Sequence, residues 1–228
     1  MIENDPNIAI LELAAQALKP LLGELVLVGG CAVGLLITER ARPPVRHTID
    51  VDLITEVTPL SNYYKLCNRL KELGFNESRD IICRWEKGGL VIDIMPTDEN
   101  VLNYTNKWYK LAAKMPLRST LPNGIEIQHV SAPLLIATKI ESYYGRGNGN
   151  YLHHDIEDII NLVDGRPEVI NELREAPQYL REFVEQEMDD LLADSRFIDS
   201  IPSHLNPSAA EQSRIPILIE RLRQIAGL

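Results

Sequence analysis

The sequence of 228 residues has no long apolar run and few cysteines. No stretch approaches the roughly 20 apolar residues that a membrane-spanning helix needs, so we expect no contact with a membrane. The three cysteines, Cys31, Cys67 and Cys83, follow no metal-ligand spacing, and their odd number argues against a disulfide framework. The first ten residues are acidic and lack the basic start of a secretory signal. Together these absences predict a cytoplasmic protein.

Positive charge is also scarce. The chain has 23 Lys and Arg residues against 33 Asp and Glu residues, which gives a formal net charge of −10. This balance argues against broad, non-specific nucleic-acid binding, which depends on a positive surface, but it leaves room for a local basic groove. The other proportions, 45% hydrophobic and 25% charged residues, are ordinary for a globular protein of one large or two small domains.

The apolar pattern predicts a mixed α/β part over residues 1–130 and a helical part over residues 131–228. In the first part we expect helices over residues 6–21, 31–40 and 58–75, and strands over 24–28, 49–54, 79–86 and 90–96. Glycine-containing turns predict two hairpins, one through residues 87–89 and one over residues 117–130. In the second part we expect helices over residues 132–145, 154–164, 167–175, 177–193 and 214–226. Loops or flexible linkers are expected over residues 41–47, 145–153 and 200–213.

Two aspartates, Asp50 and Asp52, interrupt an otherwise apolar strand. Residues two apart in a strand share one face, so both carboxylates point the same way. Two like charges about 4 Å apart repel by roughly 4 kcal/mol at an effective dielectric near 20. Either both carboxylates reach water or a positive group lies between them. Asp93 is a third acid inside an apolar strand, where an unpaired carboxylate is costly.

Gly29 and Gly30 stand between a predicted strand and a predicted helix. Glycines there let backbone amides approach a ligand, and the start of a helix favours an anion such as phosphate. Taken singly, these features also fit a tight turn, an edge strand or a strand-end acid. Taken together, three carboxylates beside a glycine turn form an oxygen cage suited to Mg²⁺, which would remove the repulsion between the acids.

The order of strand, Gly-Gly, helix, Asp-x-Asp and a third aspartate on a later strand resembles the nucleotidyltransferase superfamily that includes DNA polymerase β. Within it, "VGGCAVGLL" and "RHTIDVDLI" look most like the bacterial AbiEii-like group of abortive-infection and toxin–antitoxin nucleotidyltransferases. The resemblance covers residues 25–95. It implies a nucleotidyltransferase-type mixed β-sheet flanked by helices, followed by a helical C-terminal part.

The resemblance also implies a role for each acid and glycine. Asp50 and Asp52 would bind two Mg²⁺ ions, and Asp93 would bind the ion nearer the nucleophile and help to deprotonate an acceptor hydroxyl. Gly29 and Gly30 would hold the triphosphate of an NTP through their backbone amides.

The helical part supplies a looser match to the same superfamily, with Lys139, Asp155 and Asp158. Lys139 would neutralise phosphate charge during transfer, although its place beside the apolar stripe of its helix also fits a lysine whose stem covers core surface. Asp155 also fits an acid favoured at a helix N-terminus. The resemblance places Asp158, Cys31 and Thr48 beside the nucleotide. Cys31 stands where the superfamily usually has Ser or Thr, and a thiol is a weaker donor to phosphate than a hydroxyl.

Two further clusters have weaker support. Lys107, Lys110, Lys114 and Arg118 are interleaved with Tyr104, Trp108 and Tyr109. A basic stripe with aromatic rings suits a tRNA end or a nucleotide, and it equally fits a solvated charged face over core aromatics. The adjacent His153 and His154 are expected to point in different directions and to lack enough further ligands for a metal site.

These observations predict an Mg²⁺-dependent enzyme that moves an NMP from an NTP to an acceptor. RNA such as a tRNA 3′ end is the first candidate acceptor, in a toxin that an antitoxin protein would accompany. A small molecule, as in antibiotic adenylylation, is the second. The alternative from another class is a catalytically silent nucleotidyltransferase-fold module that binds a nucleotide or a partner protein.

Overall fold

The computed structural model describes residues 5–39, 45–57 and 60–228. The end of the helix predicted over 31–40, most of the loop predicted over 41–47 and the start of the helix predicted over 58–75 lie outside these residues. The chain divides into two compact units, Met1–Leu35 with Pro44–Ser131 and Leu36–Pro43 with Ala132–Leu228. Among the described residues, no helix combines the length and the apolar content needed to cross a bilayer.

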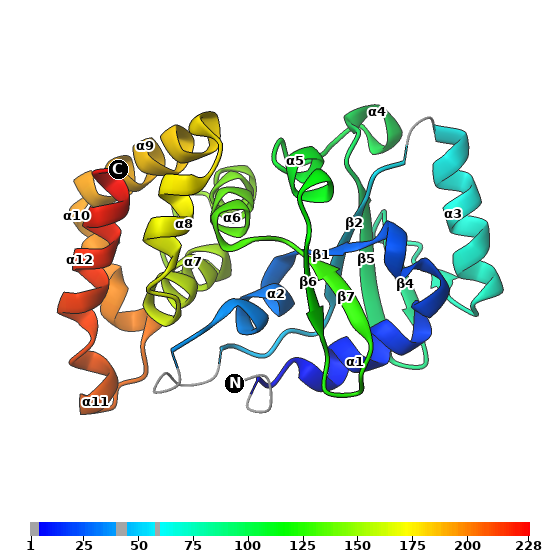
Figure 1. Cartoon of the computed structure of the whole chain (residues 1–228), viewed down its shortest axis with the longest axis horizontal. Helices are drawn as coiled ribbons and strands as arrows, with labels where there is room; N and C mark the ends of the chain where they lie inside the picture. Colours follow the sequence, from blue (N-terminus) through cyan, green and yellow to red (C-terminus); the bar gives the residue numbers. More distant parts are fainter. Residues whose placement is uncertain (1–4, 40–44, 58–59) are drawn as a thin grey trace. The chain divides into compact units, whose positions relative to one another are not determined.

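Within the described residues, the first unit contains a seven-stranded mixed sheet in the order β3-β4-β5-β2-β1-β7-β6 (Figure 1). Its strands are β1 (Val26–Leu27), β2 (Val51–Thr55), β3 (Asn76–Glu77), β4 (Arg84–Lys87), β5 (Leu90–Pro96), β6 (Leu117–Thr120) and β7 (Glu126–His129). The pairs β2–β5 and β1–β7 are parallel, and the other neighbours are antiparallel. Both predicted hairpins, β4–β5 and β6–β7, are present. The mixed α/β class is confirmed.

The helices of the first unit are α1 (Ile8–Ala17), η2 (Lys19–Glu24, a 3₁₀-helix), α2 (Gly29–Leu36), α3 (Leu60–Glu72), α4 (Glu99–Leu102) and α5 (Tyr109–Lys114). The predicted helix over 6–21 is divided at Leu18, where the tighter 3₁₀-helix begins with Pro20 in its first turn. Helix α2 starts on the glycines themselves and ends at Leu36, before the predicted end at residue 40.

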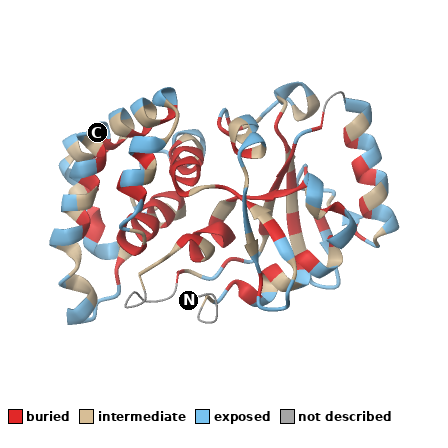
Figure 2. Cartoon of the chain, in the orientation of Figure 1, coloured by how far each residue is buried: buried red, intermediate tan, exposed pale blue. Residues whose placement is uncertain are grey.

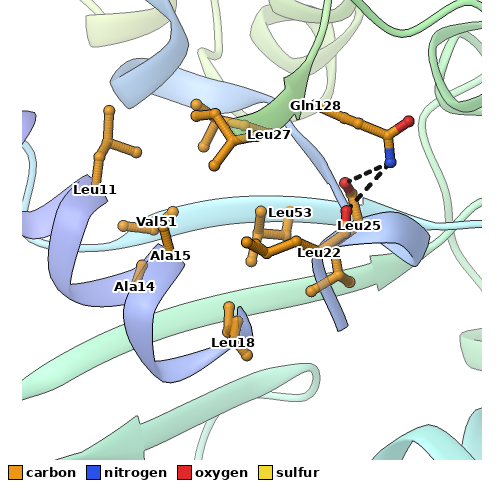
Figure 3. A pocket seen from close by; sticks show the side chains of 11 residues that line it. Leu11, Ala14, Ala15, Leu18, Leu22, Leu25, Leu27, Val51, Leu53 and Gln128 are labelled. Atoms are coloured by element: carbon orange, nitrogen blue, oxygen red, sulfur yellow. Dashed lines mark hydrogen bonds between the residues drawn. The ribbon is translucent and has the colours of Figure 1, made fainter. Parts of the chain in front are cut away.

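Helix α1 packs against β2 and β5 and covers one face of the sheet. Figure 3 shows a small apolar cavity there, where Leu11 and Ala15 of α1 face Val51 and Leu53 of β2. Because side chains alternate along a strand, Asp52 between those two residues lies on the other face. The same alternation runs along β5, where buried and half-buried residues follow one another (Figure 2). The apolar face therefore forms the core, and the other face carries the acids.

The second unit is helical in the part of it that the structure describes. Its elements are α6 (Ala132–Arg146), α7 (His154–Gly165), α8 (Val169–Glu175), α9 (Gln178–Ala193), α10 (Ser195–Ser200), η3 (Ile201–His204), α11 (Ala209–Gln212) and α12 (Ile215–Ala226). The helices predicted from apolar spacing are confirmed to within two residues at each end. The stretch over 200–213, predicted to be a flexible linker, instead contains η3 and α11.

Candidate functional site

Three charged residues form a row across adjacent strands of the first unit. Arg84 of β4 is directly opposite Asp93 of β5, and Asp93 is directly opposite Asp52 of β2. Side chains of directly opposite residues lie on the same face of a sheet. The register therefore brings Asp52 and Asp93 together, as the sequence predicted, and it adds an arginine to them.

The Arg84 guanidinium holds two of the acids. Its Nε donates to Asp93 Oδ1 at 2.8 Å, and its Nη2 donates both to Asp93 Oδ2 at 2.8 Å and to Asp50 Oδ2 at 2.6 Å. The side chains of Arg84, Asp93 and Asp50 are only 19%, 13% and 25% exposed, respectively. The hydrogen bonds to Asp93 raise the pKa of Arg84 above its ordinary value, so the guanidinium stays charged. Such bidentate, charge-assisted contacts are among the stronger polar interactions in proteins.

Arg84 therefore offsets much of the negative charge here, because it pairs with Asp50 and Asp93 and its charge also acts on Asp52. We expected water or a divalent ion to offset the repulsion, and the chain supplies a cation of its own. The sequence contained a signal for this pairing. Counting outward from the Gly88-Gly89 turn of the predicted hairpin pairs residue 87 with 90, and therefore Arg84 with Asp93.

Asp52 lies against the glycine turn. Gly29 has a φ of +69°, and a Cβ placed on it would be 1.9 Å from Asp52 Oδ2. A Cβ on Gly30 would be 2.7 Å from Nη2 of Arg46. At Gly30 the nearest atoms are thus the end of the Arg46 side chain and Cγ2 of Thr48, also at 2.7 Å, whereas Gly29 is required by the close approach of a group that belongs to the chain itself. A carboxylate at this position is also favoured by the N-terminal end of the α2 dipole.

Cys31 and Thr48 brace the segment that leads to Asp50. Cys31 Sγ lies 2.8 Å from Thr48 Oγ1 and 3.4 Å from the carbonyl oxygen of Asp50. The Thr48 backbone N–H donates to Asn7 Oδ1 at 2.8 Å. Burial raises the pKa of the Cys31 thiol to about 12, so it stays protonated. Both side chains are buried, so in this structure neither is presented at the surface of the turn.

The donor set suits a hard cation. Asp50, Asp52 and Asp93 offer carboxylate oxygens, which Mg²⁺ prefers. Between Asp50 and Asp93, the place that a metal ion would take is filled by the Arg84 guanidinium. Asp50 and Asp93 are turned toward that guanidinium. Among the described residues, a group of three possible metal ligands with atoms within 4.8 Å of one another is found only in the second unit, at His153, His154 and Asp155. The three aspartates therefore offer the donor type that Mg²⁺ takes, but their oxygens do not all lie within that distance in this structure, and the Arg84 guanidinium occupies the place between Asp50 and Asp93.

In the second unit, Lys139 of α6 forms ion pairs with two acids of α7. Its Nζ lies 2.6 Å from Asp158 Oδ2 and 3.1 Å from Asp155 Oδ1, and its side chain is 6% exposed. Arg146 donates to both oxygens of Asp155 at 2.8 Å. Burial pushes the pKa of Asp155 upward, but the hydrogen bonds from Arg146 and the charge of Lys139 outweigh it and hold the pKa at about 2. Asp155 is in the first turn of α7, as the helix-terminus interpretation predicted.

The two adjacent histidines lie closer together than we expected. The ring centroids of His153 and His154 are 4.0 Å apart, and with Asp155 they form the cluster of ligand atoms within 4.8 Å. The expectation that they point in different directions was wrong, because His153 precedes α7 as its N-cap and is not part of the helix. Asp155, however, already accepts from Lys139 and Arg146, and these two positive charges oppose a metal ion at this point.

The basic stripe lies at the surface of the first unit. Lys107, Lys110 and Lys114 are exposed, whereas Trp108 is 6% exposed. Lys107 Nζ lies 5.7 Å from the centroid of the Trp108 ring. For Trp108 the interpretation as a core aromatic beneath charged residues is confirmed. Tyr104 remains 47% exposed.

No model of a known protein family and no curated protein matches the sequence. Two solved structures, among others, match most of the chain. An antigenic nucleotidyltransferase-like protein from Paracoccidioides brasiliensis is 21% identical, with a TM-score of 0.51, and the match covers 90% of this chain and 95% of that one. The JHP933 protein from Helicobacter pylori is 11% identical, with a TM-score of 0.47, and the match covers 95% of this chain and 90% of that one.

Proposed function

We propose that this chain, which has the fold of nucleotidyltransferase-like proteins, is an Mg²⁺-dependent nucleotidyltransferase that transfers an NMP from an NTP to an acceptor. The observation that supports this best is the register of the sheet, which sets Asp52 beside Asp93 and next to the Gly29 turn. Asp50 belongs to the same group, because the Arg84 nitrogen that contacts Asp93 also contacts Asp50.

In this proposal, Asp50, Asp52 and Asp93 hold the metal. Bound Mg²⁺ would offset the charge of the triphosphate and lower the pKa of the acceptor hydroxyl. An Asp93 carboxylate oxygen would accept the proton of that hydroxyl. The backbone N–H groups at the start of α2 would donate to phosphate oxygens. Lys139 is left out of this scheme, since two buried carboxylates hold its ammonium.

The proposed acceptor is RNA, with a tRNA 3′ end as the first candidate, in a cytoplasmic toxin that an antitoxin partner would accompany. The exposed lysines 107, 110 and 114 support this choice, because they supply a local basic surface on an acidic protein. The subgroup of AbiEii-like enzymes belongs to the same proposal and is based on the sequence resemblance alone.

The test is transfer of label from each of the four NTPs, with Mg²⁺, to total RNA or to small-molecule acceptors. The wild type should label RNA with at least one NTP. Asp93→Asn should abolish labelling while its circular dichroism stays that of the wild type. Asp189→Asn, at an exposed position of α9, is the matched control and should transfer as the wild type does. If only a small molecule is labelled, the proposed acceptor changes from RNA to that molecule. If no acceptor is labelled with any NTP, the proposal is refuted.

The second candidate is a catalytically silent module that binds a nucleotide or a partner protein. Arg84 favours it, because an internal cation makes the acids tolerable without any metal. Calorimetry of NTP binding separates the two candidates. Binding that requires Mg²⁺ and is lost in Asp50→Asn supports the enzyme, whereas binding that is independent of Mg²⁺ supports the module.

A further inference from the structure

The position of Arg84 is set by the backbone on both sides of its hairpin. The preceding residue, Cys83, has a φ of +69°, a conformation that residues other than glycine rarely adopt. The Cys83 carbonyl accepts from the backbone N–H of Ile94 at 2.9 Å, and its thiol lies 3.2 Å from the hydroxyl of Tyr104. Strand β4 begins at the next residue. Strained conformations of this kind cluster at functional sites, and this one starts the strand that presents Arg84 to Asp93.

The guanidinium and a divalent ion compete for the same oxygens. Arg84 takes both carboxylate oxygens of Asp93 and one of Asp50. A cation that binds between these two acids meets both the volume and the positive charge of the guanidinium. The arginine therefore has to withdraw before a metal ion can use the two carboxylates.

We propose that Arg84 is a resident counter-ion that a divalent metal displaces from Asp50 and Asp93, and that the displaced guanidinium binds phosphate oxygens of the incoming nucleotide. This inference rests on the proposed function. The planar fork that now matches a carboxylate matches phosphate equally well. Without nucleotide, displacement costs the guanidinium its hydrogen bonds to Asp50 and Asp93. With nucleotide, the triphosphate supplies an anion to replace these partners, so metal and NTP bind cooperatively.

The experiment measures Mn²⁺ binding from the paramagnetic resonance signal of free Mn²⁺, with and without a non-hydrolysable NTP analogue. Arg84→Met should bind Mn²⁺ alone more tightly than the wild type by about tenfold, equivalent to about 1.4 kcal/mol. The analogue should tighten Mn²⁺ binding strongly in the wild type and much less in the variant. Arg69→Met is the matched control, because Arg69 pairs with Glu24 at the surface, and it should behave as the wild type.

The outcomes separate this inference from the proposed function. If Arg84→Met binds Mn²⁺ no more tightly than the wild type, the inference is overturned and the enzyme proposal stands. If neither protein binds Mn²⁺, even with the analogue, both are overturned. Thermal unfolding checks that the variant is folded. Should it not fold, Arg84→Lys keeps a charge but loses the fork, and it should bind Mn²⁺ more tightly than the wild type by a smaller factor; equal or weaker binding refutes the inference.

Discussion

Replacing Lys139 with methionine tests whether the ammonium is a structural group or one that is available to phosphate. In the structure it lies 2.6 Å from Asp158 and 3.1 Å from Asp155, and the three side chains are 6%, 2% and 0% exposed. Methionine keeps most of the stem and removes the charge. Asp155 retains the two hydrogen bonds from Arg146, so the main loss falls on Asp158.

Removing one partner of a buried ion pair costs about 3–5 kcal/mol, because the other charge stays buried without it. We expect Lys139→Met to lower the free energy of unfolding by that amount at pH 7. The remaining Asp158 carboxylate should then have a pKa above its value in the unfolded chain, so protonation relieves it. A group of this kind costs stability as the pH rises through its folded pKa. The deficit should therefore be larger at pH 8 than at pH 5.

The assay is urea unfolding followed by circular dichroism at the two pH values. Lys114→Met, at an exposed position of α5, is the control and should lie within about 0.5 kcal/mol of the wild type. The double variant Lys139→Met/Asp158→Asn should be more stable than Lys139→Met, because it no longer buries a carboxylate that has lost the ammonium. A loss below about 1 kcal/mol in Lys139→Met would refute the interpretation of the ammonium as a structural group.

Three further predictions concern single positions. Gly29→Ala should cost at least about 2 kcal/mol in thermal unfolding, because the residue has a φ of +69° and the new Cβ would meet a carboxylate oxygen at 1.9 Å; Gly23→Ala, with open space around it, is the control. Arg146→Met should raise the pKa of Asp155 from about 2 toward its ordinary 3.8. The stability that this carboxylate contributes above its unfolded pKa is then lost at a higher pH on acidification. The midpoint of acid unfolding, followed by circular dichroism, should therefore move to higher pH. Cys31, buried and with its pKa raised to about 12, should resist iodoacetamide in the folded protein, as peptide mass spectrometry can show; rapid labelling would mean that this turn opens.

The parts of the fold that follow from local pattern were predictable. The helices of the second unit repeat apolar residues at helical spacing, and β2 and β5 carry an acid within an aliphatic run, so hydrophobic burial alone identifies them. The strand predicted over 24–28 is longer than β1, which covers only Val26–Leu27, because an apolar run does not show where strand pairing stops. The strand predicted over 79–86 begins only at Arg84, since nothing in the sequence reveals the positive φ of Cys83.

The candidate site divides in the same way. Asp50 and Asp52 were identifiable as an electrostatic problem with two solutions, exposure to water or a nearby positive group, and Arg84 supplies a positive group to Asp50. Mg²⁺ was the positive group that the resemblance suggested, whereas the hairpin register pairs Arg84 with Asp93. The partners of Lys139 depend on how α6 packs against α7, and spacing within one helix carries no information about a neighbouring helix.

Whether Arg84 offsets the cost of burying Asp93 is decided by the sign of the change in unfolding free energy that Asp93→Asn causes. If Asp93 were an uncompensated acid that needs a metal ion, Asp93→Asn would stabilise the protein in EDTA, because it removes a repelled charge. If Arg84 holds Asp93 as the distances of 2.8 Å indicate, the amide keeps one acceptor and loses a charge-assisted hydrogen bond, and the variant should be less stable by about 2 kcal/mol. Urea unfolding in EDTA measures this difference, with Asp189→Asn as the exposed control. A variant more stable than the wild type would contradict the role of Arg84 as counter-ion, because the carboxylate would then be a burden that the guanidinium does not relieve.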